Sequence, residues 1–268
     1  MFRSILRQPS WRKPWSSLTT GLFYRSSKTL LEKRITKETL DDFTNDELYE
    51  YIKERTFRPG QYPLHYEKLR QYCYRVRTPE EFDRAYELIF DYHKKLLPVH
   101  GKVSRQLIES EIRFGKPKRA VKAIEHWRFV GMKPGIYGFS VLLTALSKQG
   151  DIESMKKLWY TSLDGCVALN THMLTEYVRR FAKVKAYDMV DEVFRIAKER
   201  NVRLRTPGFL VLASNKLQDG RPDEAMQVLD RMKEFGCLEN SSSNALRKEI
   251  ESVATQKKPF SNLNKEEK

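Results

Sequence analysis

A fixed period of 35 residues runs through most of this sequence. Five rows align without a gap when they start at Tyr66, Gly101, Ile136, Thr171 and Thr206. The agreement is clearest in three columns: the fifteenth (Glu80, Gly115, Gly150, Lys185, Gly220), the twentieth (Ala85, Ala120, Met155, Val190, Ala225) and the thirty-first (Leu96, Gly131, Cys166, Asn201, Gly236). A period of this length is typical of stacked supersecondary units, and it argues against one globular core.

Each row predicts two amphipathic helices joined by a turn, and the row from Ile136 to Asn170 shows this best. Its first apolar stripe has the i, i+3, i+4, i+7 spacing of a helix: Phe139, Leu142, Leu143 and Leu146. Gly150 suits the left-handed end of that helix, and Asp151 can cap the next one. The second stripe consists of Met155, Leu158 and Trp159. We therefore predict an all-α fold.

The flanking segments differ from the rows and from one another. We assign residues 32–65 to an N-terminal capping helix and linker, because Asn45 and Asp46 precede an apolar helical pattern. Residues 241–254 read as a C-terminal capping helix, which a solenoid needs to cover its last apolar face. Residues 255–268 are rich in Lys, Asn and Glu and are expected to be disordered.

The first 31 residues contain basic side chains but no Asp or Glu. They are also rich in Ser and Thr, and apolar residues alternate with the basic ones. This composition is typical of a mitochondrial transit peptide and places the protein in the mitochondrial matrix. A chloroplast transit peptide is the lesser variant, and a disordered basic arm that binds nucleic acid is the alternative.

The chain is strongly basic, with a formal net charge of +15 over 268 residues. Without the first 31 residues, 44 basic side chains still stand against 35 acidic ones, leaving about +9. A polyanionic partner is therefore expected, although a charge of this size also serves solubility. No run of 18 apolar residues occurs, so membrane insertion is not expected.

Several features of the rows resemble the pentatricopeptide repeat family. They are the period itself, Lys148 two residues before Gly150, Ala in the twentieth column, and Gly131 three residues before Pro134. The stretches GFSVLLTALSKQGDIESMKKLW and GRPDEAMQVLDRMKEFG are similar to that family's consensus, and the resemblance covers roughly 66 to 250. It implies a right-handed α-solenoid of about five 35-residue helix-turn-helix repeats (66–100, 101–135, 136–170, 171–205 and 206–240). First helices would line a concave groove, and single-stranded RNA would bind at one base per repeat.

The resemblance also implies which side chains meet a base: the fifth and the last residue of each repeat. These pairs are Arg70 with His100, Arg105 with Gly135, Ser140 with Asn170, Thr175 with Arg205, and Leu210 with Asn240. Ser140 with Asn170 matches a readable combination, one that prefers adenine. Thr175 is permitted by itself, whereas Leu210 has no hydrogen-bonding side chain. We therefore expect little sequence specificity.

The rows contain more residues suited to contacting the RNA backbone than residues suited to reading bases. Arg113, Lys148 and Lys183 share one column at the end of the first helix, while Arg70 and Arg105 would lie in the groove. Such a stripe can follow phosphates without reading bases. The alternative is a solvated charged face. The aromatic residues Trp127, Trp159, Tyr177 and Phe194 have core spacing and are predicted to serve packing.

Signatures of catalysis are missing. The five histidines have no metal-ligand spacing, and the cysteines Cys73, Cys166 and Cys237 form no close pair. No phosphate-binding loop or nucleophile elbow is present. An enzyme is therefore not expected, nor is a metal, cofactor or small-molecule substrate.

Two functions remain open from the sequence. The first is a mitochondrial RNA-binding factor that acts in RNA stability, processing or translation. The second is a structural subunit or assembly factor of a large mitochondrial complex, with the mitochondrial ribosome as the leading case. The expected partners are single-stranded RNA or rRNA and, in the second case, mitochondrial ribosomal proteins.

Overall fold

The computed structural model describes residues 43–56, 66–97 and 99–256, and every regular element within them is a helix. The chain divides into two compact units, Met1–Asp42 and Phe43–Lys268, and the described residues belong to the second. The predicted transit peptide, residues 1–31, and residues 257–268 of the predicted tail lie outside the described residues. Those assignments therefore stay predictions.

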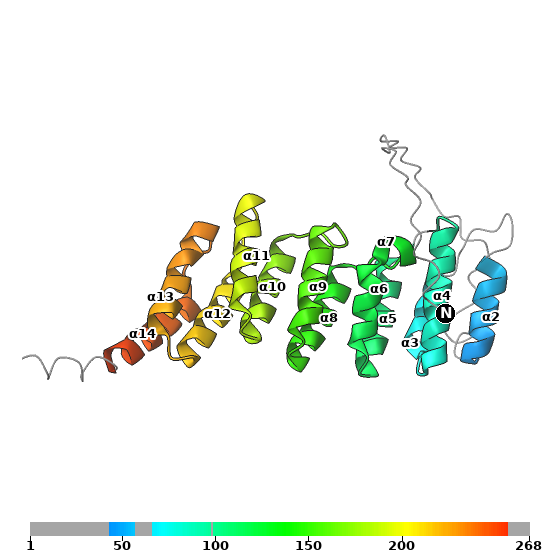
Figure 1. Ribbon diagram of the computed structural model, residues 1–268, viewed down its shortest axis with the longest axis horizontal. Coiled ribbons are helices and arrows are strands. Elements are labelled where there is room, and N and C mark those ends of the chain that lie inside the picture. Colours follow the sequence, from blue (N-terminus) through cyan, green and yellow to red (C-terminus); the bar gives the residue numbers. More distant parts are fainter. Residues whose placement is uncertain (1–42, 57–65, 98, 257–268) are drawn as a thin grey trace, which may run out of the picture. The chain divides into compact units, whose positions relative to one another are not determined.

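The described helices form pairs that repeat along the chain, preceded by α2 (Asn45–Thr56) and followed by α14 (Ser241–Gln256). The pairs are α3 (Tyr66–Arg75) with α4 (Pro79–Lys94), α5 (Gly101–Arg113) with α6 (Pro117–Glu125) and the short α7 (Trp127–Val130), α8 (Ile136–Gln149) with α9 (Ile152–Leu163), α10 (Thr171–Lys183) with α11 (Tyr187–Glu199), and α12 (Thr206–Gln218) with α13 (Pro222–Arg231) and the 3-10 helix η2 (Met232–Phe235). Figure 1 shows them in sequence order. The predicted all-α solenoid of about five 35-residue repeats is confirmed.

The first helices of the pairs form one continuous layer. α3 packs on α5, α5 on α8, α8 on α10, α10 on α12, and α12 on α14. Each second helix packs on its own first helix, and α6 also contacts α9. The core is thus a strip between two layers. The twentieth-column residues are buried in it: Ala85, Ala120, Met155, Val190 and Ala225.

The helix ends repeat one backbone conformation, even where the sequence lacks glycine. The fifteenth column has positive φ at Gly115 (71°), Gly150 (68°), Lys185 (59°) and Gly220 (75°). The thirty-first column has positive φ at Leu96 (58°), Gly131 (79°), Asn201 (50°) and Gly236 (69°). Left-handed backbone is unfavourable for most L-residues. At Leu96 and Lys185 it is accompanied by helix-ending hydrogen bonds, in which the Leu97 N–H donates to the Tyr92 carbonyl and the Ala186 N–H to the Phe181 carbonyl.

Three of the four aromatic residues predicted to serve packing are buried. Trp159 and Tyr177 are fully buried, with ring centroids 4.9 Å apart in an edge-to-face contact, and Phe194 is 2% exposed. Trp127 differs, because the second helix breaks at His126 and leaves the indole only partly covered. Its indole Nε1 is nevertheless buried, so Trp127 packs in part against its neighbours.

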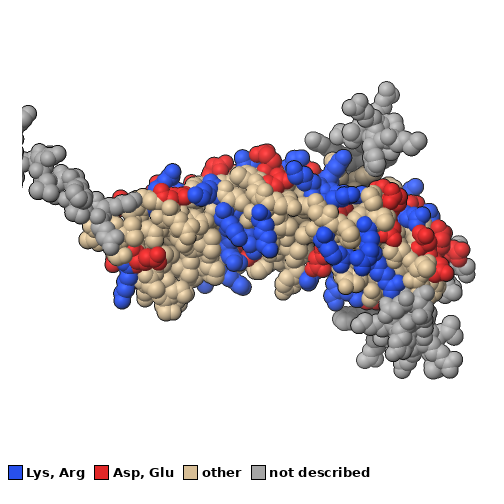
Figure 2. All heavy atoms as spheres, turned by 90° about the horizontal axis from the view of Figure 1, so that it is seen from below, with Lys and Arg blue, Asp and Glu red and all other residues tan. Residues whose placement is uncertain are grey.

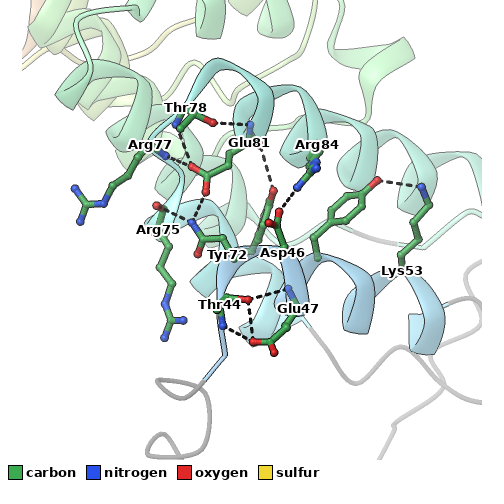
Figure 3. Close-up of polar contacts among 12 residues, drawn as sticks. Thr44, Asp46, Glu47, Lys53, Tyr72, Arg75, Arg77, Thr78, Glu81 and Arg84 are labelled. Atoms are coloured by element: carbon green, nitrogen blue, oxygen red, sulfur yellow. Dashed lines mark hydrogen bonds and ion pairs between the residues drawn. The ribbon is translucent and has the colours of Figure 1, made fainter.

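α2 covers the outer side of the first helix pair. Its residues Leu48, Tyr49 and Ile52 are buried against α3 and α4. Glu81 joins the two parts: Oε2 accepts from the Thr78 backbone N–H (3.0 Å), completing a capping box at the start of α4, and Oε1 accepts from Asn45 Nδ2 (2.5 Å) (Figure 3). At the other end, α14 packs on α12 and α13 and extends to Gln256, two residues into the segment assigned to the tail.

We predict that Gly131→Ala destabilises the protein more than Gly150→Ala does. Both glycines have left-handed backbone, which costs an alanine about 1 kcal/mol. A Cβ at Gly150 meets open space, whereas a Cβ at Gly131 would overlap the side chain of His93. Overpacking of this kind adds roughly 1–3 kcal/mol. Urea unfolding followed by circular dichroism measures both losses, and equal losses would contradict the proposed clash.

Candidate nucleic-acid interface

The first helices present a shared surface, which we call the first-helix face: the exposed side chains of α3, α5, α8, α10 and α12. In Figure 1, α7 follows α6 and lies at its upper end, so the turn between α5 and α6 lies at the lower edge. Figure 2 views the molecule from below and therefore shows this edge. Lys and Arg side chains gather there in separate groups, with acidic side chains between some of them.

Three of the predicted RNA-binding residues end consecutive first helices. Arg113, Lys148 and Lys183 are the last or nearly last residues of α5, α8 and α10, and all three are exposed. Arg113 donates from Nη2 to the carbonyl oxygen of Tyr74 (2.7 Å), and its guanidinium lies 5.3 Å from the Tyr74 ring centroid. Lys148 and Lys183 form no ion pair with any residue that the structure describes. These two ammonium groups are therefore uncompensated by nearby carboxylates.

The two predicted arginines of the fifth column are paired instead. Arg70 binds the carboxylate of Glu67, one turn earlier in α3. Arg105 Nε lies 2.7 Å from Glu109 Oε1, one turn later in α5. A phosphate at either arginine would have to compete with its carboxylate. The strongest positive charge thus lies at the helix ends and not in the middle of the first-helix face.

The predicted base-reading pair, Ser140 and Asn170, is accessible in part. Ser140 is half-buried in α8, and its hydroxyl forms no hydrogen bond within the described structure. Asn170 caps α10, where Oδ1 accepts from the Met173 N–H (3.0 Å), so only its amide NH₂ is left to bind a ligand. One repeat therefore offers one hydroxyl and one amide donor.

Two aromatic side chains that our sequence reasoning did not single out lie close to this pair in the chain. Tyr137, in the first turn of α8, is 70% exposed, and its ring centroid lies 6.5 Å from that of His172 in α10. Both occupy the second column of their rows. The third column of each row is buried, but the second column is not part of the core. An aromatic residue in the second column was therefore the signal in the sequence that could have identified these two side chains.

Thr175 does not present a group to the first-helix face. It is 4% exposed. Its hydroxyl donates to the carbonyl oxygen of Thr171 (2.6 Å) and accepts from the Arg205 backbone N–H (3.0 Å). Both hydrogen-bonding roles of the hydroxyl are therefore occupied. We correct the prediction accordingly and leave Thr175 out of the candidate interface.

A buried carboxylate, that of Glu111, lies two residues before Arg113 in α5. Glu111 of α5 is fully buried; its Oε1 accepts from the Tyr86 hydroxyl (2.8 Å) and lies 3.4 Å from Arg119 Nε, while Oε2 has no hydrogen-bond partner. Burial raises the pKa of this carboxyl to about 7, although Tyr86 and Arg119 oppose the rise. Arg119 also binds Asp83, so it is shared between two acids.

No helix in the described part of the chain has the length and apolar character needed to cross a membrane. Among the same residues, no group of three or more His, Cys, Asp or Glu side chains is placed to hold a metal ion. The three cysteines are buried and unpaired with one another.

Comparisons with known proteins agree with the geometry. A family model described as PPR repeat matches residues 214–237. A chloroplastic pentatricopeptide repeat-containing protein of Arabidopsis thaliana is 27% identical over 60% of this chain and 18% of its own length. Small ribosomal subunit protein mL103 (rPPR7), also of Arabidopsis thaliana, is 22% identical over 64% of this chain and 41% of its own. The chain thus spans less than half the length of either relative.

Similarity extends to solved structures. The crystal structure of the pentatricopeptide repeat protein PPR10 from maize superposes with a TM-score of 0.47 and 18% identity, covering 78% of this chain and 29% of that one.

We predict that Glu111→Gln stabilises the protein at pH 8 but not at pH 5. The folded-state pKa of Glu111 lies above its value of 4.5 in an unfolded chain, so ionising Glu111 costs stability as the pH rises from about 4.5 to 7. Glutamine removes that cost, which is on the order of 3 kcal/mol. Urea unfolding at the two pH values measures the difference.

The control is Glu109→Gln on the same helix. Because Glu109 is half-buried and pairs at the surface with Arg105, its loss should change stability by less than about 0.5 kcal/mol at either pH. A stability change in Glu111→Gln that is the same at pH 5 and pH 8 would argue against a raised pKa.

Proposed function

The chain belongs to the pentatricopeptide repeat family, and from that premise we propose that it is a mitochondrial protein that binds single-stranded RNA in organellar gene expression. The steps it would serve are RNA stability, processing or translation. The observation that carries the proposal is the exposed column formed by Arg113, Lys148 and Lys183 at the ends of three consecutive first helices. The proposed role is binding and not catalysis.

The column suits the sugar–phosphate backbone of a single strand. Neighbouring packed helices are about 8–10 Å apart, so the three cations recur at a regular step along the edge. Lysine binds phosphate as a point charge and does not require a fixed geometry. Lys148 and Lys183 have no carboxylate partner among the described residues to displace, so a phosphate would gain their charge without breaking an ion pair.

Base-specific recognition of the RNA is expected to be limited to the repeat at 136–170. Ser140 and Asn170 supply a hydroxyl and an amide donor there. Elsewhere the fifth-column residues are unsuited to base contacts: Arg70 and Arg105 are ion-paired, Thr175 is buried, and Leu210 is apolar. A single base contact supplies only about 1–3 kcal/mol of discrimination.

The proposed location is the mitochondrial matrix. It is supported by the basic, acid-free composition of residues 1–31. The relative described as chloroplastic keeps the other organelle as the alternative. Import of the full chain fused to a fluorescent protein, compared with a fusion lacking residues 1–31, separates the two compartments.

We predict that Lys148→Glu/Lys183→Glu weakens binding of single-stranded RNA by roughly tenfold at about 100 mM salt. With three phosphate contacts, log Kd should rise with log salt at a slope of about 2 in the unmodified protein, and of about 1 or less in the variant. Fluorescence anisotropy with a labelled oligoribonucleotide measures both quantities.

The matched control is Lys122→Glu/Lys248→Glu. It changes the net charge by the same amount, but its two exposed lysines lie on α6 and α14, outside the column. It should reduce affinity by less than about threefold, through long-range charge alone. An equal loss in both double variants would remove the column from the proposal.

A second candidate function is a structural subunit or assembly factor of a large mitochondrial complex, with the mitochondrial ribosome as the leading case. The observation that favours it is the largely apolar sequence of α12, in which Leu210, Val211 and Leu217 are only half-buried and Lys216 is the single charged side chain. A relative is named as a ribosomal subunit protein. Its partners would be rRNA and mitochondrial ribosomal proteins.

Sedimentation of a mitochondrial lysate distinguishes the two functions. A structural subunit should co-migrate with ribosomal particles and stay there at high salt, because its contacts are largely apolar. An RNA-binding factor should migrate freely, or leave the particles after RNase or salt treatment, because counterions compete with phosphate contacts.

A further inference from the structure

Three apolar residues break the pattern of the repeat near α4 and α7. The twenty-fifth column reads Phe90, Glu125, Tyr160, Arg195 and Asp230; the twenty-ninth reads Lys94, Phe129, Asp164, Glu199 and Glu234; the thirty-first reads Leu96, Gly131, Cys166, Asn201 and Gly236. Phe90 and Phe129 thus occupy columns whose other members are charged, apart from the aromatic Tyr160. Leu96 is a bulky residue in a column of small or polar ones. The other repeats show that the fold does not require apolar side chains at these positions.

Phe90 and Phe129 are in contact, and Leu96 follows Phe90 by six residues just beyond the end of α4; we call these three residues the α4–α7 patch. The rings of Phe90 and Phe129 are 5.3 Å apart between centroids, and Phe129 remains 59% exposed. Leu96 is 91% exposed and follows His93, whose Nε2–H donates to the carbonyl oxygen of Arg128 in α7 (2.9 Å). Leu96 therefore leaves α4 beside α7.

The break in the second helix helps to create this patch. α6 ends at Glu125, and α7 begins a separate turn after His126, which has φ −104° and ψ 28°. α7 packs on α4, which places Phe129 against Phe90. Leu96 adds a left-handed backbone that leucine disfavours, and its side chain gains no burial in return. An exposed apolar cluster without a structural role is typical of a contact surface.

The border of the patch is basic. Lys94 is exposed one turn after Phe90, while Lys133 Nζ and the Arg128 guanidinium each lie 5.2 Å from the centroid of the Trp127 ring in α7. Of the nearby acids, Glu125 lies 3.5 Å from Lys157 Nζ, and Asp164 lies 2.9 Å from Arg128 and neutralises it. Asp91, next to Phe90, forms no ion pair with a described residue, so the positive charge of the border rests on Lys94 and Lys133. An incoming segment would meet apolar side chains in the centre and positive charge at the border.

We propose that the α4–α7 patch docks an acidic, amphipathic segment of a partner protein. Its apolar side chains would cover Phe90, Leu96 and Phe129, and its carboxylates would face Lys94 and Lys133. The patch belongs to the second-helix layer, whereas the basic column lies at the ends of first helices. The protein can therefore bind this partner and RNA at the same time.

Two other occupants fit the chemistry less well. RNA bases need open ring faces for stacking, but the rings of Phe90 and Phe129 pack on one another, and Leu96 has no aromatic face. A second copy of this chain that apposed the same patch would bring two basic borders together, which like charges disfavour. An acidic protein segment satisfies both the apolar centre and the charge.

The test is a display selection of randomised helical peptides against the immobilised full chain, followed by anisotropy titration of the enriched peptides. We expect enriched peptides to combine apolar anchors with net negative charge. They should lose about tenfold or more in affinity for Phe129→Ser, as for a central aromatic anchor. The matched control is Tyr160→Ser. Tyr160 is also an exposed aromatic residue, with 53% of its surface accessible, and it shares the twenty-fifth column with Phe90. It lies in the repeat 136–170, outside the patch.

Circular dichroism shows whether each variant folds, and Leu96→Ser carries the test if Phe129→Ser does not, since Leu96 lies outside any helix. The proposal is overturned if no acidic apolar peptide is enriched, or if the peptides bind both patch variants as tightly as the unmodified chain. It is also overturned if the patch variants lose RNA affinity, or if they lose a concentration-dependent self-association seen by analytical ultracentrifugation.

Discussion

The packing of each first helix on the next is the contact on which the rest of this structure depends. No helix pair closes a core of its own; the buried residues of one pair meet those of its neighbours. Such an array is stabilised by nearest-neighbour interfaces, so a change in one turn is transmitted to the adjacent pair. The contact between Gly131 and His93 is one example, because it joins the end of α7 to α4.

The same stacking decides which charges are free. Many basic side chains are used between neighbouring repeats, as where Lys198 Nζ lies 2.8 Å from Glu234 and Arg128 lies 2.9 Å from Asp164. Other cations are neutralised within one helix, as Arg105 is by Glu109. Lys148 and Lys183 form no ion pair with any of the described residues. The net charge of the chain therefore does not locate a binding surface; the ion pairs must be known first.

Much of the fold was predictable because it is encoded in local patterns. Apolar stripes, cap residues and a constant period placed two helices in every row, and the first helices begin at the row starts Tyr66 to Thr206. The candidate interface was less predictable. Thr175 has a suitable side chain for a base contact, but neighbouring backbone groups occupy its hydroxyl. Trp127 has core spacing, but the break at His126 leaves it partly exposed.

The sequence by itself determined the repeat, its helical content and the positions of its turns, because each depends on residues close together in the chain. Only the tertiary structure decided which cations are neutralised between repeats, which polar groups are satisfied, and that Phe129 lies against Phe90. Those outcomes depend on residues about one period apart, whose side chains meet only after the helices stack. The physical reason is that hydrogen bonds and ion pairs act over a few ångströms. The alignment of two residues in one column of the repeat does not tell how far apart their side chains lie in the folded protein.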